Sequence, residues 1–156
     1  MTRFCLLCVL AFGLTYSAHA RIGETVDAIE VRYGKPIPGS LKNPVKHSKN
    51  YSAMGAPDSI TSAKYLFNGF AIHVEFTNGR SVKETFTKDE LDSSDIDALL
   101  KANSDNKKWT PIAPEATDKG VTHWKREDGV TAFFYPSPHS QKPPSSLTIA
   151  CATTGF

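Results

Sequence analysis

Alternation of apolar and polar residues over positions 63 to 87 restricts this stretch to a β-sheet with one buried face. Every second residue is apolar: Phe70, Ile72, Val74 and Phe76, then Val82 and Phe86. Polar side chains such as His73 and Glu75 occupy the opposite phase, which is the two-residue period of a strand. The sequence therefore predicts two antiparallel strands that meet at the Asn78-Gly79 pair.

The loop between these strands must contain an odd number of residues. A two-residue loop would place the two apolar sets on opposite faces of the hairpin. We therefore expect a three-residue loop at 77 to 79, with Gly79 in the left-handed conformation and Val74 opposite Val82. Glu84 then lies on the apolar face, as the single mismatch of the pattern.

The start of the chain has the features of a secretory signal peptide. Residues 1 to 20 carry one positive charge, an apolar run too short to span a bilayer as a helix, and the small-residue ending Ala18-His19-Ala20. We expect cleavage before Arg21, a secreted or periplasmic location, and no transmembrane segment in the mature chain. Leu7 precedes Cys8, where a lipoprotein signal has a small residue, so we expect no lipid.

The mature chain, residues 21 to 156, is long enough for one domain with its own core. Loss of Arg3 lowers the formal net charge from +2 to +1, and this balance argues against a nucleic-acid partner. Cys151 is the one cysteine outside the signal peptide, so an internal disulfide is excluded. Nothing in the sequence calls for a cofactor.

Two segments have the apolar spacing of helices. We predict a helix at 26 to 33, capped by Thr25 and ended by Gly34. A second helix is predicted at 95 to 102, with Ser93 or Ser94 as its cap. The acids near the start of this second helix suit the helix dipole. They also leave open a calcium loop, although its ligand spacing and glycine are missing.

The pattern of the rest of the chain predicts further β-strands. We predict a short strand at 109 to 112, a hairpin at 121 to 135 and a last strand at 147 to 151. A three-residue loop at 127 to 129 places Trp124, which we expect in the core, opposite Ala132. The predicted fold class is α+β, with short helices packed on an antiparallel sheet of two glycine-turn hairpins plus a C-terminal strand.

Two motifs carry a resemblance. The chain resembles uncharacterised small secreted bacterial proteins that have a helix ending in R-Y-G-K-P, here residues 32 to 36, and a later W-x-R-x-D-G hairpin, here 124 to 129. The element order of the first half is also distantly similar to small outer-membrane assembly lipoproteins and to the β-lactamase-inhibitor-like fold. That resemblance implies short helices on an antiparallel sheet. The lipidated cysteine of the lipoproteins is absent here.

Three positions invite a catalytic or metal-binding interpretation. His73 and Glu75 share one face of a strand, and His123 is a third candidate ligand on another strand. The alternative interpretation is that these are solvent-facing polar residues of a half-exposed sheet. Cys151 suggests a thiol nucleophile, but its phase with Leu147 favours a buried structural cysteine.

The strongest remaining signal is a basic segment. A long loop predicted at 35 to 57 and the end of the preceding helix carry five cations and no acid. We take these as candidate contacts to an anionic envelope component or protein: Arg32, Lys35, Lys42, Lys46 and Lys49. A non-enzymatic secreted or envelope-associated binding module is the preferred function, and a small secreted hydrolase or metal-dependent enzyme is the alternative.

Export with cleavage after Ala20 is directly testable. The intact mass of the exported protein is expected to match a chain that begins at Arg21 and carries no acyl group, because the small-residue ending fits the cleavage site. A mature form that starts at another residue, or that carries a lipid, would contradict this prediction.

Overall fold

The computed structural model describes residues 22–42, 60–113, 120–137 and 144–151. Within these ranges the chain forms two helices and seven strands. In chain order they are α1 (Val26–Tyr33), β1 (Ser62–Phe67), β2 (Phe70–Thr77), β3 (Arg80–Lys88), α2 (Ser93–Ala102), β4 (Trp109–Ile112), β5 (Thr122–Arg126), β6 (Thr131–Tyr135) and β7 (Ser145–Ala150).

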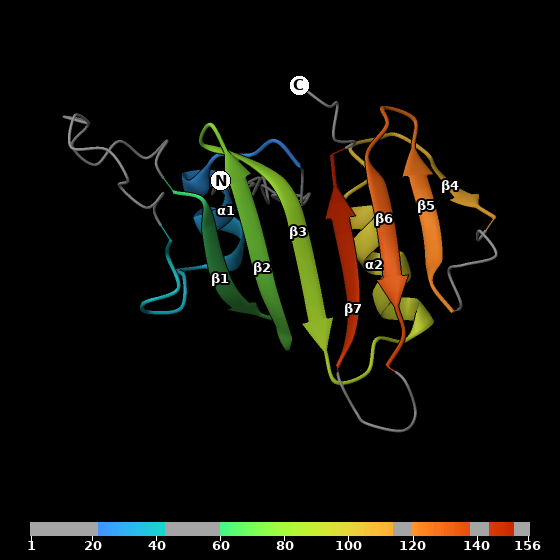
Figure 1. The fold of residues 1–156 in the computed structure, drawn as a ribbon, viewed down its shortest axis with the longest axis horizontal. Helices are drawn as coiled ribbons and strands as arrows, with labels where there is room; N and C mark the ends of the chain where they lie inside the picture. The colour runs from blue at the N-terminus through green and yellow to red at the C-terminus, as the bar shows by residue number, and fades with distance from the viewer. Residues whose placement is uncertain (1–21, 43–59, 114–119, 138–143, 152–156) are drawn as a thin grey trace, which may run out of the picture.

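All seven strands belong to one antiparallel sheet with the order β1-β2-β3-β7-β6-β5-β4. Each half of the chain contributes a helix followed by a meander of adjacent strands, and the two meanders meet where β3 pairs with β7. Both helices lie on the same side of the sheet, behind it in Figure 1. The α+β class with an antiparallel sheet and short helices is therefore confirmed.

Helix α1 has the predicted bounds and the predicted caps. The Thr25 side chain accepts a hydrogen bond from the Ala28 amide, and Gly34, with a φ of 85°, ends the helix. One side of the helix is buried against the sheet through Val26, Ile29 and Tyr33.

Helix α2 begins earlier than predicted and has a different cap. Asp92, not Ser93 or Ser94, accepts a hydrogen bond from the Asp95 amide at 2.8 Å, while the Asp95 carboxylate receives the Asp92 amide. This reciprocal arrangement satisfies two amides, whereas a serine cap alone would satisfy one. The carboxylates of Asp92 and Asp95, considered above as calcium ligands, therefore cap the start of this helix.

The loop of the β2–β3 hairpin differs from the prediction. Thr77 pairs with Arg80, so the turn contains only Asn78 and Gly79, with φ values of 52° and 71°. The extra residue is Val82 on β3, which forms a β-bulge between the Glu75–Lys83 and Phe76–Ser81 pairs. The expected three-residue loop and the Val74–Val82 pair are therefore wrong.

The bulge still brings the two apolar sets to one face. Val74 lies opposite Glu84 and Ile72 lies opposite Phe86, and all four side chains are buried. The mismatch noted in the sequence, Glu84, is thus a buried carboxylate.

A second two-residue turn, which was not predicted from the sequence, joins β1 to β2. Asn68 and Gly69 form this turn, with φ values of 49° and 81°, and Phe67 pairs with Phe70 across them. The most regular stretch of the sequence is therefore a three-stranded meander.

The β5–β6 hairpin follows the prediction. Trp124 lies opposite Ala132, and the Arg126 amide donates to the Val130 carbonyl at 2.7 Å across a three-residue loop. Gly129, with a φ of 92°, takes the left-handed position that this loop requires. Trp124 is half-buried and packs against the core.

The W-x-R-x-D-G motif forms a structural clamp. The Arg126 side chain is buried, donates to both carboxylate oxygens of Asp128 at 2.8 Å, and lies over the Trp109 ring. A further Arg126 nitrogen donates to the Asn103 carbonyl at the end of α2. Arg126 thereby ties the hairpin loop to β4 and α2, and its guanidinium lowers the pKa of Asp128 to about 2.

Part of the predicted basic loop belongs to the sheet edge. The Ile37 amide donates to the Lys64 carbonyl at 2.8 Å, and Lys42 forms an antiparallel bridge with Ser62. Residues 37 to 42 therefore cover the outer edge of β1, although the sequence predicts a loop over residues 35 to 57. The remaining residues of the loop, 43 to 57, lie outside the described ranges.

Removing the Asp128 carboxylate tests the clamp. Asp128→Ala leaves the buried Arg126 charge without its anion, and we expect a loss of about 3 kcal/mol in the free energy of unfolding, measured by urea denaturation. This is the low end of the range for one partner of a buried pair, since Asp128 is 30% exposed. Asp97→Ala, at an exposed position of α2, is the control, expected within about 0.5 kcal/mol of wild type. Equal losses in the two variants would contradict the clamp.

Candidate functional site

The face of the sheet opposite the helices is uncovered in the described part of the chain (Figure 1). Because paired residues share a face, the strand registers define rows of side chains that cross all seven strands. One row consists of Lys64, His73, Thr85, Thr148, Phe133, His123 and Ile112. The next consists of Ser62, Glu75, Lys83, Ala150, Thr131, Lys125 and Thr110. We call this surface the open face.

Positive charge predominates on the open face. Lys64, Lys83 and Lys125 lie in these rows, and Lys42 joins them because it pairs with Ser62 at the edge. Glu75 is the acidic residue in the two rows, and it bonds Lys83 at 2.9 Å. Four lysines against one glutamate leave three net positive charges on these positions.

The pKa of His73 responds to this local positive charge. Partial burial lowers the pKa of His73, Glu75 acts in the opposite sense, and the positive charges of Lys64, Lys83 and Lys42 lower it further. The imidazole is therefore neutral at neutral pH. Lys42, from the segment along the sheet edge, is thus close enough to act on a side chain in the middle of β2.

The proposed metal ligands do not converge. His73 on β2 and His123 on β5 share the open face, but four strand intervals separate them in the sheet order, roughly 19 Å along the sheet. Glu75 bonds Lys83, and the His123 ring packs edge-on against Phe133 at 4.8 Å. Within the described ranges, no group of three His, Cys, Asp or Glu side chains is arranged to hold a metal ion.

Cys151 is exposed, so the expectation of a buried structural cysteine is wrong. Strand β7 ends at Ala150, which pairs with Lys83. Cys151 therefore lies beyond the paired part of the strand, and its side chain is outside the core. Partial desolvation raises the pKa of the thiol, which keeps it protonated at neutral pH and disfavours a nucleophilic role.

Two members of the predicted cationic set are paired with acids. Arg32 forms an ion pair with Glu24, and its side chain is only 8% exposed, so it does not belong to an accessible basic surface. Lys35 bonds Glu30 at 2.7 Å near the end of α1. Lys42 is the member of the set that lies at the open face.

The other two predicted members, Lys46 and Lys49, lie outside the described residues.

Among the described residues, neither edge of the sheet presents a long uncovered strand. Residues 37 to 42 occupy the edge of β1 through backbone hydrogen bonds. The other edge is β4, a four-residue strand that contains Pro111, which cannot donate a ladder hydrogen bond. A partner is therefore expected at the open face rather than as an added strand.

Glu84 is the unusual ionisable group of the helix side. It is fully buried, and Tyr33 of α1 donates to one of its carboxylate oxygens at 2.9 Å. The other oxygen has no hydrogen-bond partner among the described residues. Burial raises the pKa of Glu84 to about 7, against the smaller opposing effects of Tyr33 and Arg32.

No protein-family model, curated protein or solved structure matches this chain. Across the described ranges, none of the helices has the length and apolar character needed to cross a membrane.

The raised pKa of Glu84 predicts a pH-dependent stability. The folded state holds this proton up to about pH 7, whereas the unfolded carboxyl loses it near 4.5, so stability falls as pH rises through this window. The shift corresponds to on the order of 3 kcal/mol, measured as the decrease in unfolding free energy between about pH 5 and about pH 8. Glu84→Gln is expected to remove most of this decrease.

Glu90→Gln, at an exposed position, is the control and is expected to retain the wild-type pH dependence. A Glu84→Gln variant whose stability still falls as steeply as that of wild type would contradict the assignment to Glu84.

Proposed function

We propose that this chain is a non-enzymatic binding module that holds an anionic protein partner against its open face. The observation that carries the proposal is the positive charge of an uncovered sheet surface, with Lys42, Lys64 and Lys125 along it and Glu75 already bonded to Lys83. Such a surface attracts and orients a negatively charged partner, and the attraction falls as salt increases.

A protein partner suits the remaining side chains of this face. Exposed apolar groups lie on the same side of the sheet. Ile112, at 41% exposure, belongs to the first row, and Leu66 at 69% and Tyr135 at 46% belong to a neighbouring row that Ala71, Thr87 and Ser146 complete. Exposed aromatic and aliphatic groups offer apolar contact area to a protein, whereas a purely electrostatic surface would suffice for anionic lipid. The small Ser and Thr side chains in the middle of the sheet allow close approach.

The alternative, a metal-dependent enzyme or small hydrolase, loses its main support. Its candidate ligands, His73 and His123, lie at separate places on the open face, and Cys151 keeps its proton at neutral pH. A binding role uses the same residues without requiring them to converge.

Export and an envelope-associated or secreted location belong to the same proposal. They rest on the signal-peptide features of residues 1 to 20. The distant likeness of the first half of the chain to the β-lactamase-inhibitor-like fold is part of this proposal, and it rests on the element order there, a helix followed by an antiparallel meander.

Charge removal on the open face tests the proposal. The full chain, immobilised, would be used to capture partners from envelope extract at low and high salt. Lys42→Gln combined with Lys64→Gln and Lys125→Gln is expected to weaken capture of a specific protein at least tenfold at low salt, because the screened attraction is lost.

The control removes two positive charges from the other side of the molecule. Lys35→Gln combined with Lys101→Gln, near the ends of the two helices, is expected to leave capture unchanged. Equal effects of the two variants, or salt-insensitive capture, would contradict the proposal. Binding to anionic phospholipid vesicles with no protein captured would instead identify a lipid surface.

A further inference from the structure

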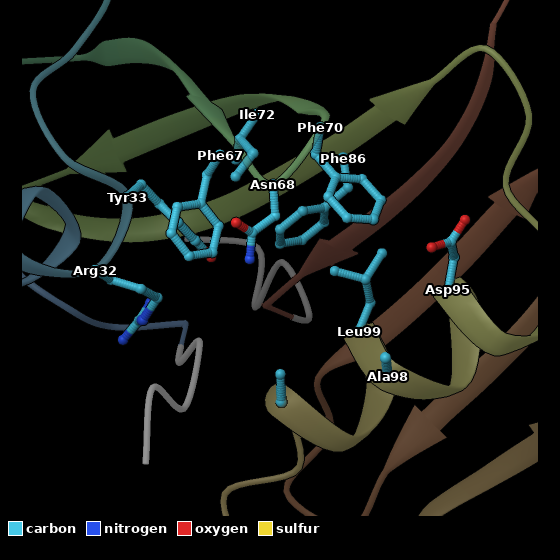
Figure 2. A pocket seen from close by; sticks show the side chains of 11 residues that line it. Arg32, Tyr33, Phe67, Asn68, Phe70, Ile72, Phe86, Asp95, Ala98 and Leu99 are labelled. Carbon is cyan, nitrogen blue, oxygen red and sulfur yellow. The ribbon is translucent and has the colours of Figure 1, made fainter. Parts of the chain in front are cut away.

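A pocket lies on the helix side of the sheet, between α1 and α2. Its volume is about 210 Å³, and Figure 2 shows α2 side chains facing aromatic side chains of β2 and β3 across it. The apolar lining that the argument uses comprises Tyr33, Phe67, Phe70, Ile72, Phe86 and Leu99. This site is separated by the sheet from the open face and is independent of the proposed function.

Solvent reaches the pocket at its rim. Asn68, in the turn between β1 and β2, and Ala98, on α2, are both exposed and both line it. Phe70 and Leu99 are only half-buried although they are apolar and face each other across the space. An apolar molecule that enters here would remove these side chains from water, which is favourable.

One strongly polar group lines the pocket without being satisfied. The Arg32 side chain is only 8% exposed, and it pairs with Glu24 through one of its terminal nitrogens. The other terminal nitrogen, Nη1, is buried with no hydrogen-bond partner among the described residues. A buried donor without an acceptor is unfavourable, so a ligand that supplies an acceptor gains free energy there.

The acidic groups near the pocket are already engaged. Asp95, which also lines the pocket, bonds Lys88 at 2.7 Å. Tyr33 donates to Glu84, and Glu24 holds the other side of the Arg32 guanidinium. Among the charged groups of this wall, Arg32 therefore offers the free donor to an incoming acceptor, and the side-chain amide of Asn68 lines the same pocket.

We infer that this pocket binds a small carboxylate with an apolar body. The carboxylate accepts a hydrogen bond from Arg32 Nη1, and the body lies between Leu99 and the rings of Phe70 and Phe86. An apolar cavity of about 150 Å³ is large enough for benzene, and drug-sized ligands occupy roughly 300 Å³ or more. A pocket of about 210 Å³ thus suits a medium-chain or single-ring acid.

Octanoate is the probe, and octylammonium, with the same chain and the opposite charge, is the ligand control. Each ligand is titrated into the full chain below its micelle concentration, and binding is measured from amide NMR shifts. Octanoate is expected to bind at least tenfold more tightly than octylammonium. Arg32→Met keeps the apolar stem and removes the donor, so it is expected to weaken octanoate binding by about tenfold or more.

A second pair of variants keeps the test decisive if Arg32→Met fails to fold. Ala98→Trp fills the rim of the pocket and is expected to abolish binding, whereas Asp97→Trp, exposed on the same helix and outside the lining, is expected to retain it. The inference is overturned if octanoate does not bind, if octylammonium binds equally well, or if the two tryptophan variants behave alike.

Discussion

Antiparallel pairing between β3 and β7 is the interaction on which the rest of this structure depends. The two halves of the chain each form a meander, and this pairing is where the meanders become one sheet. Glu84 lies opposite Ile149 and Phe86 opposite Leu147, so the junction also forms the middle of the core. Without it, both strands would present unpaired backbone groups and buried side chains to water. The carboxylate of Glu84 is held at this junction, and its burial there raises its pKa.

The sheet separates two kinds of surface. On the helix side, each buried ionisable group has a partner: Glu84 has Tyr33, Arg32 has Glu24, and Arg126 has the partly exposed Asp128. On the open face, lysines outnumber acids and stand in solvent among small hydroxyl side chains. Buried charges need fixed partners, whereas exposed ones are free to meet a mobile partner. The two faces therefore support different roles, a small enclosed site behind the sheet and a broad contact surface in front of it.

Local patterns predicted the elements well and their connections less well. Periodicity identified α1, and the glycine loop at Gly129 placed Trp124 opposite Ala132, because these features depend on neighbours in sequence. The predicted odd-numbered loop between β2 and β3 was wrong, because the one-residue offset that the pattern requires comes from a bulge at Val82, and periodicity alone cannot distinguish a bulge from a longer loop. The Asn68-Gly69 turn had a usable signal, since Asn-Gly between alternating apolar residues favours a two-residue hairpin.

The site was harder to predict because its parts meet across the sheet. Sequence phase placed His73 and Glu75 on the same face correctly, but phase contains no information about strand order, which separates both of them from His123. The sequence predicted one basic segment from Arg32 to Lys49. In the structure, Arg32 at the end of α1 pairs with Glu24, whereas Lys42 at the sheet edge lies on the open face. Glu84 was the informative exception, because a charged residue that interrupts an apolar phase must either leave the core or find a partner within it. Tyr33, 51 positions away in the chain, is that partner.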